Sequence, residues 1–126
     1  MECAFLVYEG LTALDLIGPY EVLSGLAELE LKFVAKNPGE VRVDSRAFGI
    51  MVDHALADVP RPEVIVVPGG TSGTLAAAED AVILNWLRTA HEYSRYTTSV
   101  CTGSPTKAGE AIVARAISAL DGSILG

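Results

Sequence analysis

The stretch YTTSVCTG, residues 96–103, is typical of a β-strand over Tyr96–Val100 that breaks sharply into a helix. At such a break, Cys101 would project from a turn at the carboxyl end of the strand. Backbone N–H groups and a helix N-terminus favour the thiolate there. The stretch therefore predicts an α/β fold with Cys101 as a candidate nucleophile. The alternative interpretation is that Cys101 is a small apolar residue buried in the core, as cysteines often are.

Further strands and helices are predicted on the amino-terminal side of this break. The apolar runs at residues 3–8 and 63–67 are typical of strands buried on both faces of a parallel sheet, and residues 29–35 form another candidate strand. A helix is predicted over residues 19–26, because Pro19 suits a first helical position, and another over Ala81 to Tyr93, from its 3.6-residue apolar stripe. Residues 41–45 and 49–53 alternate like a small hairpin.

Strands that alternate with helices predict a doubly wound parallel sheet, in which ligands bind beyond the carboxyl ends of the strands. Three features follow predicted strands and so fall on that rim. Asp15 follows the first strand, Gly69 and Gly70 follow the strand at 63–67, and Cys101 ends the last one. Their convergence is the main indication of function in the sequence.

Composition limits the partners and the compartment. The net charge of −7 and a pI near 4.7 argue against nucleic acid and anionic membranes, which leaves small molecules and proteins. With Cys3 and Cys101 as the only cysteines and no signal-like segment, a reducing cytoplasm is expected. The chain of 126 residues predicts a single domain over residues 1–126, and no residue spacing indicates a metal site.

Each rim residue has a chemical role available to it. Cys101 can attack an electrophilic carbon, and Asp15 can hold or deliver a proton. Backbone N–H groups at Gly69 and Gly70, with the amide of Thr102, can bind developing negative charge. The alternatives are that Asp15 only caps the turn before Pro19, that the glycines only permit a loop, and that Thr102 is an ordinary first-turn hydroxyl.

Three ordered motifs resemble the ThiJ/PfpI superfamily, in the branch that contains isocyanide hydratases. They are LDLIGPYEVL at residues 14–23, VIVVPGG at 64–70 and TSVCTGS at 98–104, so the resemblance covers residues 1 to about 104. It implies a flavodoxin-like fold with a cysteine at a nucleophile elbow, usually in a homodimer. It implies neither a metal nor an organic cofactor.

The resemblance also implies roles for individual residues. Cys101 matches the nucleophile, Asp15 the acidic partner, Thr102 a neighbour that hydrogen-bonds in the site, and Gly69 with Gly70 the oxyanion loop. The implied reaction is the addition of water to an isocyanide, which gives an N-substituted formamide. The family domain would continue beyond residue 104 with another strand and a His-bearing segment. Here residues 105–126 instead predict an atypical helix and tail, so the fold is expected to be shortened at the C-terminus.

Three other functions fit the same motifs. One is a ligand-sensing domain of a transcriptional regulator, although the sequence contains no basic helix-turn-helix segment. Another is a redox-responsive or protein-protective member, in which Cys101 is oxidised reversibly without turnover. The last is a remnant that depends on dimerisation for its shape. Thiol reactivity and formamide production distinguish these functions from a hydratase.

Overall fold

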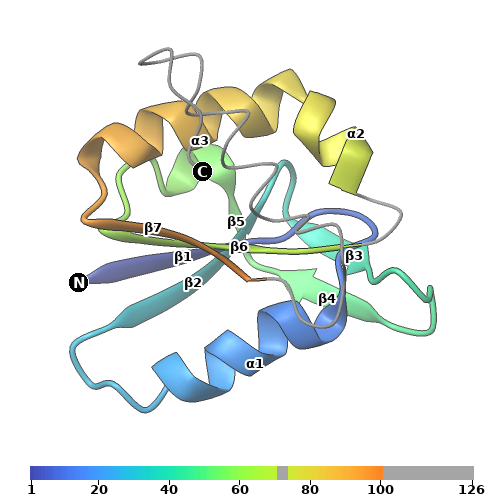
Figure 1. Ribbon diagram of the computed structural model, residues 1–126, viewed down its shortest axis with the longest axis horizontal. Coiled ribbons are helices and arrows are strands. Elements are labelled where there is room, and N and C mark those ends of the chain that lie inside the picture. Colours follow the sequence, from blue (N-terminus) through green and yellow to red (C-terminus); the bar gives the residue numbers. More distant parts are fainter. Residues whose placement is uncertain (71–73, 101–126) are drawn as a thin grey trace.

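The computed structural model describes residues 1–70 and 74–100, which form a five-stranded sheet with helices on both faces (Figure 1). Every strand pair in this sheet is parallel. The strand order across the sheet is β5 (His54–Ala55), β2 (Glu30–Ala35), β1 (Glu2–Leu6), β6 (Val64–Pro68) and β7 (Tyr96–Val100). Helix α1 (Ala13–Leu23) covers one face, and α2 (Thr74–Glu79) and α3 (Ala81–Tyr93) cover the other. The predicted flavodoxin-like α/β fold is confirmed.

The predicted hairpin forms a separate two-stranded antiparallel sheet. It consists of β3 (Gly39–Arg42) and β4 (Gly49–Val52). The first strand starts two residues earlier and ends three residues sooner than the predicted 41–45, and the second ends one residue before the predicted 49–53. Arg46 has a φ of 64° in the connection between the two strands. A 3₁₀ turn, η1 (Leu56–Asp58), follows β5. The helix and tail predicted over residues 105–126 lie outside the described residues.

Helix α1 corrects the sequence prediction. The helix begins at Ala13, and Pro19 lies inside it. Pro19 has no N–H to donate to the carbonyl of Asp15 four residues earlier, which is why proline normally marks a helix start. Here Thr12 occupies the N-cap position, and the apolar contacts of the first turn outweigh the missing bond: Leu16 is fully buried. Asp15 is consequently a helical residue and not a turn residue.

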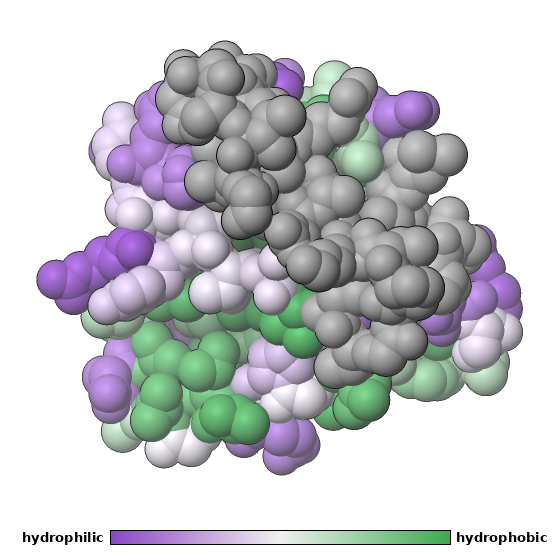
Figure 2. All heavy atoms as spheres, viewed as in Figure 1, coloured by the Kyte–Doolittle hydropathy of each residue, from purple (hydrophilic) through white to green (hydrophobic). Residues whose placement is uncertain are grey.

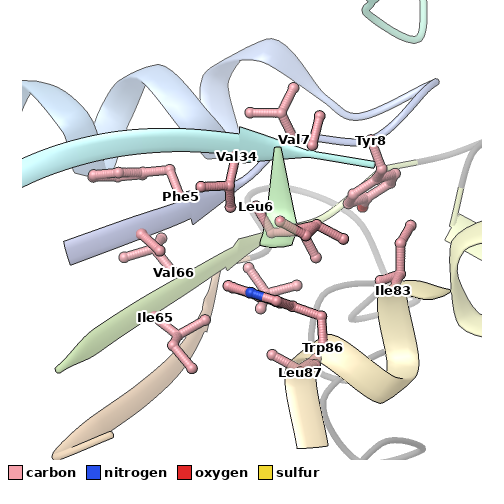
Figure 3. Close-up of a cluster of buried hydrophobic side chains, with 14 of the residues drawn as sticks. Phe5, Leu6, Val7, Tyr8, Val34, Ile65, Val66, Ile83, Trp86 and Leu87 are labelled. Carbon is pink, nitrogen blue, oxygen red and sulfur yellow. The ribbon is translucent and has the colours of Figure 1, made fainter. Parts of the chain in front are cut away.

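Helix α3 has the bounds that its apolar stripe predicted. Asp80 caps it, because its Oδ1 accepts hydrogen bonds from the backbone N–H groups of Val82 at 2.9 Å and Ile83 at 3.3 Å. Trp86 packs in the core, and its indole N–H donates to the carbonyl of Val59 at 2.9 Å. Figure 3 shows Ile83, Trp86 and Leu87 of α3 on one side of the sheet. The buried residues of the stripe therefore serve packing, whereas Tyr93 at the end of the helix is 51% exposed.

The core continues on the α1 face of the sheet. Phe5 of β1 contacts the rings of Tyr20 and Phe33 edge-on, with centroid distances of 6.4 Å and 5.3 Å. Phe5 and Phe33 are paired in the register of β1 and β2, so both side chains point to the same face. Cys3 is fully buried in the same strand, as expected for a residue of the apolar run at residues 3–8.

Candidate functional site

The start of α1 is bonded to the segment that follows β6. The backbone N–H of Thr12 donates to the carbonyl of Gly69 at 2.9 Å, and Leu11 forms an isolated antiparallel bridge with Gly70. Both glycines are buried. The structure thus brings together the backbone of two of the segments that the sequence placed on the rim.

The end of β7 lies beside the same segment. Val100 pairs with Pro68 in the parallel register of β6 and β7, so the strand stops level with the residue before Gly69. Cys101 is the next residue in the chain, but Cys101 and Thr102 lie outside the described residues. The described ends of β6 and β7 therefore lie at the edge of the sheet where the rim was predicted. The positions of the Cys101 and Thr102 side chains stay predictions.

Asp15 is a buried acid at the base of this rim. Only 1% of its surface is exposed, and no other charged residue in ranges 1–70 and 74–100 is buried. It is the third residue of α1 and lies in the first turn of the helix. The N-cap position belongs to Thr12, whose Oγ1 donates to Asp44 Oδ2 at 2.9 Å. Asp15 is therefore not the N-cap residue of α1.

Tyr8 is a residue of this region that sequence reasoning missed. Its hydroxyl donates to the carbonyl of Pro68 at 2.7 Å across the end of the sheet, and only 4% of the residue is exposed. The bond fixes the chain immediately before Gly69 and Gly70. The available signal was a tyrosine at the end of a buried apolar run, because a buried phenol needs a hydrogen-bond partner.

The second cysteine does not compete for a nucleophilic role. Burial raises the pKa of the Cys3 thiol to about 11, so this side chain stays protonated at neutral pH. Within the described ranges, no cluster of His, Cys, Asp and Glu side chains could hold a metal ion. No helix in the same ranges is both long and apolar enough to cross a bilayer.

Comparison with known proteins identifies relatives over most of the chain. Residues 1–116 match the DJ-1/PfpI family. The chain is 36% identical over 104 residues to an isonitrile hydratase from Pseudomonas putida, a match that covers 82% of this chain and 45% of that protein. The chain therefore spans about half the length of this curated relative.

Solved structures give the same result. The crystal structure of a ThiJ/PfpI family protein from Pseudomonas syringae superimposes with a TM-score of 0.82 at 34% identity, covering 91% of this chain and 45% of that one. DJ-1beta from Drosophila melanogaster has a TM-score of 0.75 at 21% identity, covering 91% and 59%, and shares the fold. Sequence, strand order and superposition agree, and the chain belongs to the DJ-1/PfpI family.

Proposed function

We propose that this chain carries the site of a cysteine-dependent hydratase that converts an isocyanide to an N-substituted formamide. Cys101 is the nucleophile, and Asp15 transfers the proton. Thr102 hydrogen-bonds in the site, and the backbone at Gly69 and Gly70 receives the developing negative charge. The proposal also covers the substrate class, a small electrophilic molecule.

The reaction balances without a cofactor. The Cys101 sulfur forms a bond to the terminal carbon of the isocyanide, and that carbon takes one proton, which gives a thioimidate. Water then adds to the same carbon, and the carbon–sulfur bond breaks. The nitrogen finishes with one proton and the sulfur recovers its own. Asp15 is the group that holds and returns the proton between these steps.

One observation supports the proposal: the turn before Asp15, the segment at Gly69 and Gly70, and the end of β7 lie at one end of the sheet. The Thr12 to Gly69 hydrogen bond joins the turn before Asp15 to the glycine segment, and the pairing of Val100 with Pro68 brings the residue before Cys101 to the same level. The buried position of Asp15 adds support, since a carboxylate is rarely buried unless a partner or a function retains it. The 36% identity to an isonitrile hydratase supports the choice of substrate.

The test is formamide production from phenyl isocyanide, measured by chromatography in parallel with the alkylation rate of the thiols against pH. Cys101→Ala is expected to abolish turnover and the fast alkylation. Cys3→Ala is the matched control, because the Cys3 thiol is buried and is expected to contribute to neither signal. Asp15→Asn is expected to retain alkylation but to lower turnover by about 100-fold or more, the usual contribution of a general acid or base.

The alternatives give different results in the same assay. A rapidly alkylated and reversibly oxidised Cys101 without formamide would replace the hydratase with a redox-responsive role. Slow alkylation of both thiols without turnover would reject both functions for this chain. Turnover that survives in Cys101→Ala would disprove the cysteine mechanism.

We also propose that the chain forms a homodimer through α1. Leu14, Ile17 and Val22 are exposed apolar residues of this helix, at 62%, 37% and 75%. Figure 2 shows apolar residues gathered at the lower left, over the helix. Exposed apolar side chains that gather on one helix favour burial against another surface, and a second copy supplies a matching one.

A further inference from the structure

A cavity of about 370 Å³ opens on the opposite side of the sheet from α1. It lies between the carboxyl ends of β1 and β2, strand β3, and the helices α2 and α3. Its volume falls within the range of small-ligand sites. Of the residues of the proposed hydratase site that the structure describes, Asp15, Gly69 and Gly70 do not line it. The described residues that line it are Val7, Tyr8, Glu9, Ala35, Lys36, Asn37, Pro38, Glu40, Val41, Ala76, Ala77, Asp80 and Ile83.

The inner part of this cavity is apolar. Val7, Ala35 and Ala77 are buried residues of its lining. Figure 3 shows Tyr8 directed toward Ile83 of α3, and both residues line the cavity. Because the Tyr8 hydroxyl donates its proton to Pro68, the residue offers a ligand its ring surface and no further donor. Such a lining suits a short aliphatic or aromatic body, and a tyrosine ring also attracts cations.

The outer part of the cavity carries charge. Lys36 Nζ lies 2.9 Å from Asp80 Oδ2, and the lysine side chain is 46% exposed. Glu9 and Glu40 are also in the lining, and their partners Arg46 and Arg42 are exposed and outside it. Among the described residues, the lining thus contains three carboxylates and one ammonium group. Ion pairs as exposed as these contribute about 0–1 kcal/mol, so an incoming ammonium group can replace Lys36.

We propose that this cavity binds a small organic cation, a primary amine with a short apolar body, and that Asp80 receives the ammonium group. Lys36 occupies the same position in the unliganded chain and competes with the ligand. The apolar body lies against Tyr8, Ile83 and the residues at the ends of β1 and β2. An anion of the same size is expected to bind more weakly, because the described lining carries three carboxylates and one ammonium group.

The competition with Lys36 predicts that removing this lysine strengthens the binding of the cation. Lys36→Met removes a positive charge from the lining, so the cation is expected to bind about threefold more tightly, the effect of one partly exposed ion pair. Asp80→Asn is expected to weaken binding by a similar factor. Asparagine caps helices as well as aspartate does, so this variant retains the cap of α3.

The experiment is a titration of the full isotope-labelled chain with 2-phenylethylammonium, followed by amide NMR shifts. The control probe is 3-phenylpropanoate, which has the same ring and spacer with the opposite charge. Lys32→Met is the matched control for Lys36→Met, because Lys32 pairs with Glu2 at 2.7 Å outside the cavity lining. Asp58→Asn is the control for Asp80→Asn, since Asp58 accepts from the backbone N–H of Ala55 elsewhere.

The proposal expects saturable shifts at Ala35, Lys36, Ala77 and Ile83 with the amine only, tighter binding in Lys36→Met and weaker binding in Asp80→Asn. It is overturned if millimolar amine gives no saturable shift, or if both probes bind equally. It is also overturned if Lys36→Met binds no more tightly than Lys32→Met. This last comparison does not depend on whether Asp80→Asn folds.

Discussion

Replacing Tyr8 with phenylalanine tests whether its hydroxyl holds the chain before Gly69 and Gly70. Tyr8→Phe removes a single oxygen and leaves the ring in its buried place. The buried carbonyl of Pro68 then loses a donor that now lies at 2.7 Å. Because a buried acceptor that loses its partner is not rehydrated, we expect the free energy of unfolding to fall by about 1–2 kcal/mol.

The size of the effect can be measured by thermal and urea unfolding. For a domain of this length, a loss of about 1–2 kcal/mol corresponds to a melting temperature lower by roughly 3–8 °C. Amide hydrogen exchange at Gly69 and Gly70 should quicken in the same variant, because the anchor lies next to them. The denaturant slope should stay unchanged, since the variant exposes the same surface on unfolding.

Tyr93→Phe is the matched control. Tyr93 is 51% exposed and its ring lies under Arg61 at 4.2 Å, a contact that phenylalanine retains. This variant should change the free energy of unfolding by less than about 0.5 kcal/mol. Equal stability of Tyr8→Phe and Tyr93→Phe, with unchanged exchange at the two glycines, would refute the anchoring role.

Three other predictions concern titration and association. Burial raises the pKa of Cys3 to about 11, so the unfolded chain releases this proton first, and the stability relative to Cys3→Ala should fall as the pH rises from about 9 to 11. The hydrogen bond from Lys36 lowers the pKa of Asp80, so the ionised carboxylate stabilises the fold at pH values above the pKa of this group in the unfolded chain. In urea unfolding, the stability difference between the chain and Asp80→Asn should therefore shrink as the pH falls from about 5 to 2. Val22→Glu should weaken self-association in light scattering, whereas Val82→Glu, at a 53% exposed valine on α3, should not; equal masses for both variants would contradict dimerisation through α1.

The elements with a strong local pattern were predictable from the sequence. The apolar stripe and the capping aspartate determined the bounds of α3, and the bounds of β7 also agreed with the structure. Helix α1 was predicted too late because Pro19 suits a helix start, whereas tertiary packing of Leu16 places the proline inside the helix. The two-residue strand β5 and the short α2 have too few residues to give a periodic signal.

The candidate site was predictable to the level of its segments. Strand connectivity alone placed Asp15, Gly69 and Gly70 on one rim, because parallel strands end at the same edge of a sheet. The bond from Tyr8 to Pro68 could not be predicted, since it joins residues far apart in the chain whose relation depends on the register of β1 and β6. The cavity beside Lys36 and Asp80 was missed for the same reason, as its walls come from separate elements.

The pairing of β1 with β6 has a consequence for how the chain folds. The pairs β1 with β2, and β6 with β7, are each closed by a short connection through helices, so each half forms contacts between nearby residues. The pair β1 with β6 joins the two halves across the hairpin and η1. Of these three strand pairs it closes the longest chain loop, so its formation costs the most conformational entropy. We therefore expect the pairing of β1 with β6 to form last during folding. Two fragments produced by cutting the chain between η1 and β6 are then expected to reassemble when they are mixed.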